Sequence, residues 1–168
     1  MSLNDVKHYK SWSGLNKKLM DNLCDELQGR ITYFLTRYHE VHNSYGRASI
    51  RLDGKELTNF SWVEMYKQDF DTNELWKETG KWDSENTALK RKWDEEAVFS
   101  DNDFLEAATN FLQLSVKDAL ASEDYLIKVF AIMDKRVGKR TLKKIKTGEQ
   151  YKTYPEWVQQ FYKLRLGE

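Results

Sequence analysis

Cysteine and proline are nearly absent from this chain of 168 residues, which has Cys24 and Pro155 and no other residue of either type. A single cysteine excludes an internal disulfide and any zinc site built from Cys-x-x-Cys pairs. The sequence also has no run of about 18 apolar residues, and its first residues lack the pattern of a secretory signal. These absences predict a cytoplasmic protein that does not enter a membrane.

The motifs of several common enzyme classes are absent as well. Gly-x-Ser-x-Gly, Gly-x-x-x-x-Gly-Lys-Ser/Thr and His-Glu-x-x-His do not occur, and HEVH at residues 39–42 is one residue short of the last pattern. The sequence therefore predicts no cofactor, no metal and no particular catalytic residue. An enzyme with scattered functional groups stays open, because general acids and bases need no fixed spacing.

What the sequence does contain is typical of one folded domain, residues 1–168. Hydrophobic residues make up 40%, aromatic residues 14% and charged residues 32%, which provides a core under a heavily charged surface. The net charge is zero, but residues 69–106 hold twelve acids and five bases, whereas residues 135–146 hold seven bases and no acid. This uneven distribution says more about partners than the total charge does.

The first part of the chain, residues 11–70, predicts a helix followed by a β-meander. Four leucines recur every four residues, as on an amphipathic helix, and Gly29 can end that helix: Leu15, Leu19, Leu23 and Leu27. Residues 30–38, 47–53 and 55–62 predict three antiparallel strands, with Asp53-Gly54 as the turn between the last two. Helices are expected on one face of this sheet.

The last part, residues 101–168, predicts helices. One helix is expected from Asp101 or Asp103 to about Ala121, with Ser115 on its apolar side, and a second from a Ser122 cap to a stop at Gly138. Because the link between them is short, they must form an antiparallel αα-hairpin. KRTLKKI, residues 139–145, predicts a short basic helix, and Pro155 is expected to start the last helix.

Residues 71–100 lie between these two parts and show no clear period. Trp76, Trp82 and Trp93 stand there among many charges, so we expect a partly irregular, acidic, tryptophan-rich stretch. These tryptophans either pin a long loop onto the core or form a contact surface for another protein. Together the three parts predict an α+β fold with an N-terminal helix, a three-stranded antiparallel meander and a mainly helical C-terminal half.

The hairpin end at residues 39–47 is the first candidate site. It holds His39, His42, Asn43, Tyr45 and Arg47. If the segment were helical, the two histidines would share a face and could bind a metal. In an extended segment, residues three positions apart point to opposite faces, so the two histidines could not bind one metal together. The interpretation as a polar hairpin loop is favoured, while an enzyme or metal site stays as an alternative.

The basic segment 135–146 is the second candidate site. Its cations could contact the phosphates of a nucleic acid: Arg136, Lys139, Arg140, Lys143 and Lys144. A solvent-exposed helix face would give the same pattern, with Leu142 and Ile145 pointing inward. The acidic stretch and a pI of about 6.8 make nucleic acid the less favoured partner.

Several blocks of the chain resemble a family of uncharacterised bacterial proteins. These are WSGLNKKL, RITYFLTRYHEVHNSYGR, FSWVEMY and DKRVGKRTL, and the resemblance covers nearly the whole chain. It implies a bacterial origin and a single-domain layout, with no assigned activity, cofactor or catalytic residue. Elimination and surface chemistry favour a non-catalytic module that binds another protein or itself.

Overall fold

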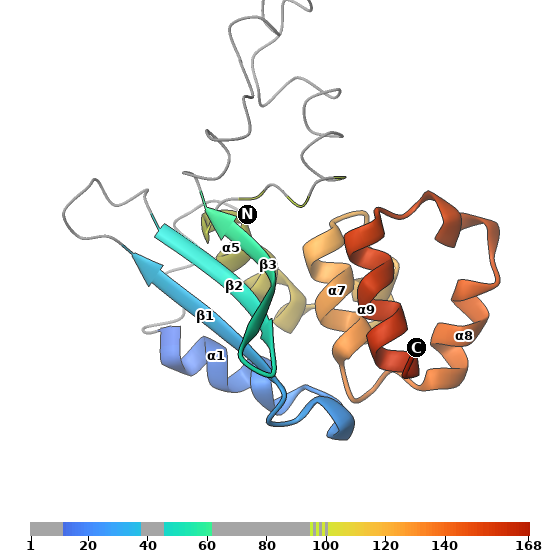
Figure 1. Ribbon diagram of the computed structural model, residues 1–168, viewed down its shortest axis with the longest axis horizontal. Coiled ribbons are helices and arrows are strands. Elements are labelled where there is room, and N and C mark those ends of the chain that lie inside the picture. The colour runs from blue at the N-terminus through green and yellow to red at the C-terminus, as the bar shows by residue number, and fades with distance from the viewer. Residues whose placement is uncertain (1–11, 38–45, 62–94, 96, 98, 100) are drawn as a thin grey trace, which may run out of the picture.

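The computed structural model of the protein describes residues 12–37, 46–61, 95, 97, 99 and 101–168 (Figure 1). The predicted irregular stretch 71–100 therefore lies, except for three residues, outside the described part of the chain. Residues 38–45 of the predicted hairpin end lie outside it as well.

The described residues form the predicted α+β fold. Helix α1 (Trp12–Asp21) and a 3-10 turn, η2 (Asp25–Leu27), precede the sheet, and the remaining elements are helical. The strands are β1 (Ile31–Arg37), β2 (Gly46–Leu52) and β3 (Lys55–Ser61). The later helices are α5 (Asp101–Gln113), α6 (Val116–Leu120), α7 (Tyr125–Met133), α8 (Lys139–Lys146), η4 (Glu149–Thr153) and α9 (Glu156–Leu166). None of these described helices is long and apolar enough to cross a membrane.

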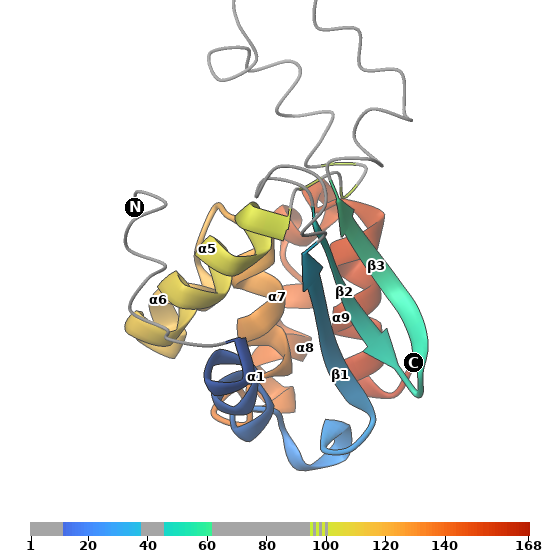
Figure 2. The ribbon, with the colours of Figure 1, turned by 90° about the vertical axis from the view of Figure 1, so that its left-hand side faces the viewer.

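The sheet is the predicted antiparallel meander, in the order β1-β2-β3. Asp53 and Gly54 have φ values of 51° and 82°, as a tight hairpin turn between β2 and β3 requires. Tyr33 is paired with Ile50, and both side chains are buried on the face that α1 and α5 contact. Figure 2 shows these helices on one side of the sheet.

Aromatic rings join the sheet to the helices. Phe104 of α5 lies at the centre, with its ring centroid 5.8 Å from that of Phe60 on β3 and 5.7 Å from that of Phe130 on α7. Phe111 stacks on Phe130 as well, with the ring centroids 5.5 Å apart. These contacts place α7 in the middle of the core, where every residue from Leu126 to Met133 is buried.

The N-terminal helix is shorter than the leucine spacing predicts. It ends at Asp21, and Leu23 instead forms an isolated antiparallel bridge with Asp134. The Cys24 amide donates to the Met133 carbonyl at 2.9 Å. The leucine spacing continues because all four leucines are buried, although the backbone has left the helix. Cys24 is buried too and packs as a small core residue.

The predicted αα-hairpin is present, since α5 and α6 both contact α7, but its helix boundaries differ from the prediction. Its first arm is divided, because Ser115 is not on an apolar face but caps α6, accepting from the Asp118 amide at 3.1 Å. The cap of α7 is Asp124 rather than Ser122. Gly138 does not end α7, which stops at Met133; it precedes α8.

Arg165 of α9 holds the link between α7 and α8. Its guanidinium is 4% exposed and donates to the backbone carbonyls of Ile132 at 3.0 Å, of Asp134 at 3.4 Å and of Val137. The Asp134 carboxylate, also buried, accepts two bonds from the Arg136 guanidinium, at 3.0 and 2.8 Å. These contacts therefore fix the start of the basic segment, at Arg136 and Val137.

Candidate functional site

Lys128 is the one charged residue of α7, whose sequence is YLIKVFAIM. The helix is buried along its length, and Lys128 is only 4% exposed. A buried ammonium loses several kcal/mol of hydration, so it is rarely kept without a compensating partner. The partners of Lys128 are therefore the first question about a functional site in this protein.

Two neighbours contact the Lys128 ammonium. Its Nζ donates to the carbonyl of Leu120, the last residue of α6, at 2.6 Å. It lies 3.5 Å from the Tyr154 hydroxyl and 4.8 Å from the centroid of the same ring, a cation–π distance. Both neighbours are neutral, and burial lowers the pKa of the Lys128 ammonium below its ordinary value.

Lys128 lines a cavity of about 800 Å³, which we call the Lys128 cavity. Its walls come from α6, the segment before α7, the link between α7 and α8, α8 itself and η4. Apolar surface is supplied by Val116, Leu120, Val137 and Ile145, together with the rings of Tyr125 and Tyr154. The volume is in the range of sites that enclose a small ligand or a few side chains of a partner.

Tyrosine rings make the wall beside Lys128 rigid. The Tyr154 ring stacks on Tyr162 at 6.1 Å and meets the edge of Tyr125 at 6.2 Å. Tyr151 contacts both Tyr154 and Tyr162, at 6.0 and 5.1 Å. Burial and then the nearby Tyr125 raise the pKa of the Tyr154 phenol, so it stays neutral beside the ammonium.

The rim of the Lys128 cavity carries both signs of charge. Lys117 and Glu123 are exposed at the α6 and α7 end, and Glu149 is exposed at the η4 end. Arg136 also lines the cavity, but its guanidinium is bonded to Asp134. The arrangement can bind an anionic group at its buried end and polar groups at its mouth.

Most residues of the predicted hairpin-end site lie outside the described part of the chain. These are His39, His42, Asn43 and Tyr45, and the same holds for Trp76, Trp82 and Trp93. Within the described residues, no group of three His, Cys, Asp or Glu side chains is placed to hold a metal ion. The alternatives of an enzyme or metal site at residues 39–47 thus remain predictions.

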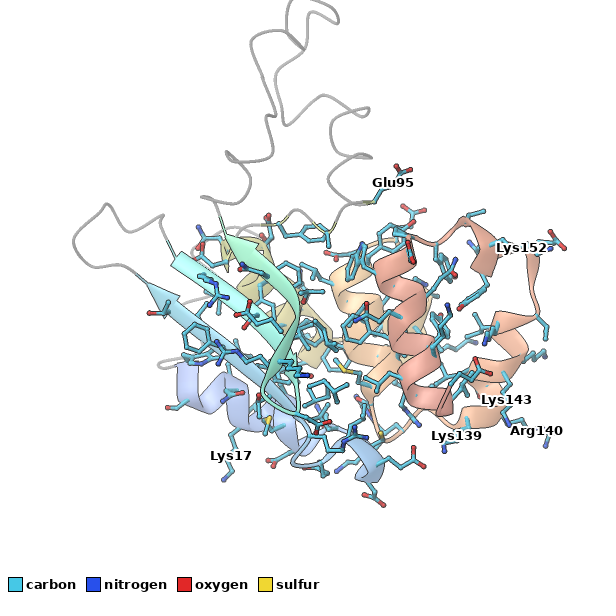
Figure 3. The ribbon with its side chains drawn as sticks, in the orientation of Figure 1. Lys17, Glu95, Lys139, Arg140, Lys143 and Lys152 are labelled. Carbon is cyan, nitrogen blue, oxygen red and sulfur yellow. The ribbon has the colours of Figure 1, made fainter. Side chains whose placement is uncertain are left out.

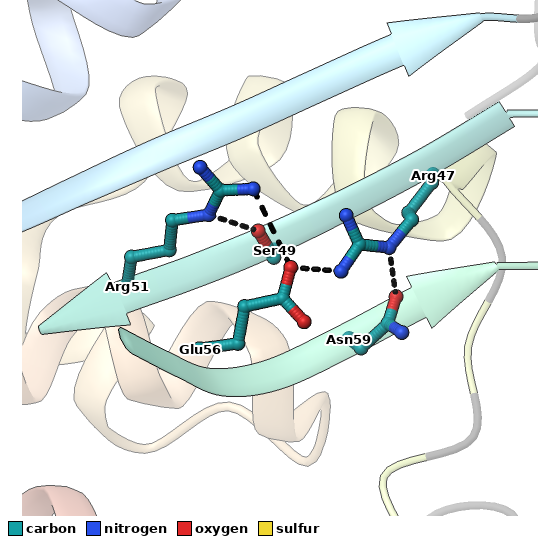
Figure 4. Close-up of polar contacts among 5 residues, drawn as sticks. All are labelled: Arg47, Ser49, Arg51, Glu56 and Asn59. Atoms are coloured by element: carbon teal, nitrogen blue, oxygen red, sulfur yellow. Dashed lines mark hydrogen bonds and ion pairs between the residues drawn. The ribbon is translucent and has the colours of Figure 1, made fainter. Parts of the chain in front are cut away.

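Arg47 is described, and it belongs to a polar network on the face of the sheet opposite α1 and α5 (Figure 4). Its guanidinium donates to Glu56 and, at 3.1 Å, to Asn59. Arg51 contacts the same Glu56 carboxylate at 3.4 Å, and its guanidinium lies 4.3 Å from the centroid of the Phe34 ring. These contacts give Arg47 a role in holding β2 against β3.

Three of the seven cations of the basic segment have acidic partners among the described residues. Lys139 contacts Glu26 at 2.7 Å, Lys146 contacts Glu168, and Arg136 contacts Asp134. Arg140, Lys143 and Lys144 are exposed. Figure 3 shows Lys139, Arg140 and Lys143 pointing away from the end of α8. Of the five predicted phosphate contacts, Arg136 and Lys139 have acidic partners in the structure, and all five remain predictions.

Sequence reasoning missed the Lys128 cavity. The signal that could have indicated it is one lysine inside an otherwise apolar stretch, LIKVFAIM, because a core helix has no reason to carry a lone charge. The cavity itself is built from segments far apart in the sequence, so its lining could not be read from any one of them.

The chain was compared with curated proteins, with solved structures and with families of related sequences. No curated protein and no solved structure matches it. The SF0329 protein family matches residues 11–166, nearly the whole chain. Its description assigns no activity, in agreement with the predicted resemblance. The chain belongs to the SF0329 protein family.

Proposed function

We propose that this protein is a non-catalytic binding module that takes a segment of another protein into the Lys128 cavity. The observation that carries the proposal is a cavity of about 800 Å³ whose wall combines apolar and polar side chains with one buried lysine. Concave surfaces that combine apolar groups with polar groups are typical of sites that bind a ligand.

The chemistry of the lining favours a polypeptide ligand. Tyr125, Tyr154 and Arg136 are of the residue types that contribute most to protein interfaces. Lys117 and Glu149 at the rim can bond to the polar groups of a peptide chain. The lining contains no histidine and no cysteine, the groups that most often serve as base and nucleophile.

Blocking the mouth of the cavity tests the proposal. Ala121 is exposed and lines the cavity, so Ala121→Trp fills the entrance without disturbing the core. Gln113→Trp is the matched control, because Gln113 is exposed and does not line the cavity. Peptides selected from a random library on the wild-type protein should bind Gln113→Trp unchanged and bind Ala121→Trp at least about tenfold more weakly. Equal binding to both variants, or a library that yields no peptide, would contradict the proposal.

Nucleic acid is a second candidate partner, favoured by the exposed face of α8. Arg140, Lys143 and Lys144 form no ion pair with other described residues. If all three contact phosphates, log affinity for a duplex should fall against log salt concentration with a slope of about −3. Filter binding at two salt concentrations measures that slope, and no binding at low salt would remove this candidate.

A further inference from the structure

The Lys128 ammonium has a buried position and no counter-ion in the described part of the protein. Its contacts are the Leu120 carbonyl at 2.6 Å and the Tyr154 hydroxyl at 3.5 Å, and no described carboxylate pairs with it. An ammonium has three N–H donors. One of these donors makes the short bond to the Leu120 carbonyl, and another points to the more distant Tyr154 hydroxyl. At least one N–H group of Lys128 is therefore left to bond to a ligand in the cavity.

The hydrogen bond to Leu120 explains why a donor is present at position 128, but it does not explain why that donor carries a positive charge. The carbonyl at the end of α6 needs a donor, which Lys128 supplies. A neutral amide or hydroxyl donor would satisfy the same carbonyl without the cost of burying a full charge. A positive charge at this position gains most from an anionic ligand, because the attraction is strong where water is excluded.

The rest of the lining indicates what accompanies the anion. Three cations and two acids line the cavity, and Arg136 is already neutralised by Asp134. Val116, Leu120 and Ile145 offer apolar surface. The ligand that fits is a carboxylate attached directly to an apolar group.

We propose that Lys128 binds the terminal carboxylate of a partner protein whose last residue is apolar; this rests on the proposed function. The last residue of a chain carries a carboxylate and a side chain on the same Cα, which matches an ammonium that has apolar groups such as Leu120 beside it. An internal acidic residue would bring backbone from both of its sides into the cavity, and each of those amide groups would need a partner there. A chain end brings the fewest such groups.

The test compares peptides that differ only at the chain end. A library of random peptides with free C-termini and the same library with amidated C-termini are bound to the wild-type protein. For one selected peptide, dissociation constants are measured for the free acid, the amide, and an amide that ends in glutamate. Each is measured on the wild type and on Lys128→Met, which keeps the length of the side chain and removes the charge.

On the wild type the free acid should bind at least about tenfold more tightly than the amide, the value of one hydrogen bond between charged groups. On Lys128→Met this ratio should fall to about one. The comparison of acid with amide on the wild type needs no variant. It therefore still tests the inference if Lys128→Met fails to fold.

Each other outcome overturns the inference in a distinct way. If acid and amide bind the wild type equally but Ala121→Trp weakens both, the cavity binds peptides and the terminal carboxylate is irrelevant. If the ratio persists on Lys128→Met, the carboxylate binds elsewhere. If the glutamate amide binds as tightly as the free acid, a side-chain carboxylate suffices. If no peptide binds in either form, the proposed function fails as well.

Discussion

Lys128 makes the stability of this protein depend on pH in the alkaline range. Because burial lowers its pKa in the folded state, the unfolded chain binds more protons than the folded one between that lowered value and about 10.4. The free energy of unfolding contributed by Lys128 therefore rises as pH increases through this window. Below the window the full cost of burying the ammonium is present.

We expect Lys128→Met to be more stable than the wild type at pH 7, by about 1 kcal/mol, because the gain from removing a buried charge exceeds the loss of the donor to the Leu120 carbonyl. This advantage should shrink as the pH is raised to about 10. Urea unfolding at several pH values measures it. Tyr33 and Tyr162 have pKa values raised by burial, but they are the same in both proteins and cancel in the difference. An advantage that stays constant with pH would contradict the expectation.

Tyr162 offers a second test at the scale of one residue. Its ring is fully buried, and its hydroxyl has no hydrogen-bond partner among the described residues. Tyr162→Phe should keep the ring contacts with Tyr151 and Tyr154 and raise the free energy of unfolding by up to about 1 kcal/mol. Thermal and urea unfolding at pH 7 measure this change.

Above pH 10 the gap between Tyr162→Phe and the wild type should widen. Burial raises the pKa of Tyr162 above its ordinary value, so the unfolded chain loses that proton first and the wild type loses stability as pH rises. Tyr162→Ala is the packing control and should cost about 3 to 5 kcal/mol. A Tyr162→Phe variant less stable than the wild type would show that the hydroxyl has a partner.

At the scale of elements, the start of β2 depends on a glycine. A Cβ atom built on Gly46 would lie 2.5 Å from Oδ2 of Asp101 and 2.7 Å from the Thr36 carbonyl. Asp101 is buried at the start of α5, so neither neighbour can move away freely. We expect Gly46→Ala to lower the free energy of unfolding by about 2 kcal/mol, as overpacking does.

The control for Gly46→Ala is Gly138→Ala. A Cβ atom at Gly138 meets nothing within 4 Å, so that change should cost no more than about 1 kcal/mol, the loss of a favourable residue before α8. Chemical unfolding of both variants gives the comparison. Equal losses would show that the close approach of Asp101 to Gly46 is not what requires glycine.

The elements that local sequence determines were predicted correctly, and those that tertiary contacts determine were not. Asp53 and Gly54 form the predicted turn because its φ values are set by those two residues. The first helix was predicted too long because its leucines stay buried after the backbone bends at Leu23 to pair with Asp134. No pattern within residues 15–27 contains that partner.

The Lys128 cavity illustrates the same limit for function. Lys128 is visible in the sequence as a charge inside an apolar helix, but Tyr154 and Leu120 become its neighbours only through the packing of η4 and α6. The basic segment was visible too, yet its pairing with Glu26 and Glu168 was not. Composition therefore indicated the cations but not their acidic partners, and it did not indicate the Lys128 cavity.

At the scale of the whole molecule, Arg165 connects the last helix to the segment after α1 through the link between α7 and α8. Its guanidinium bonds to carbonyls of Ile132, Asp134 and Val137. The same link pairs with the segment after α1, where the Cys24 amide donates to Met133 and the Lys135 amide donates to the Asn22 carbonyl at 2.8 Å. The last helix thus supports the position of the first.

Arg165→Met should remove this support. The buried carbonyls of Ile132 and Val137 would lose this donor, while the Asp134 carbonyl would keep its bond from the Val137 amide at 3.0 Å. We expect the free energy of unfolding to fall by about 3 kcal/mol. Lys146→Met is the control, since its ion pair with Glu168 is partly exposed and should contribute less than about 1 kcal/mol. Hydrogen exchange adds the specific readout. In Arg165→Met the exchange rates of the Cys24 and Lys135 amides should increase by a larger factor than those of the β2 amides. A uniform increase over all amides would mean that Arg165 stabilises the fold globally and does not couple the last helix to the first.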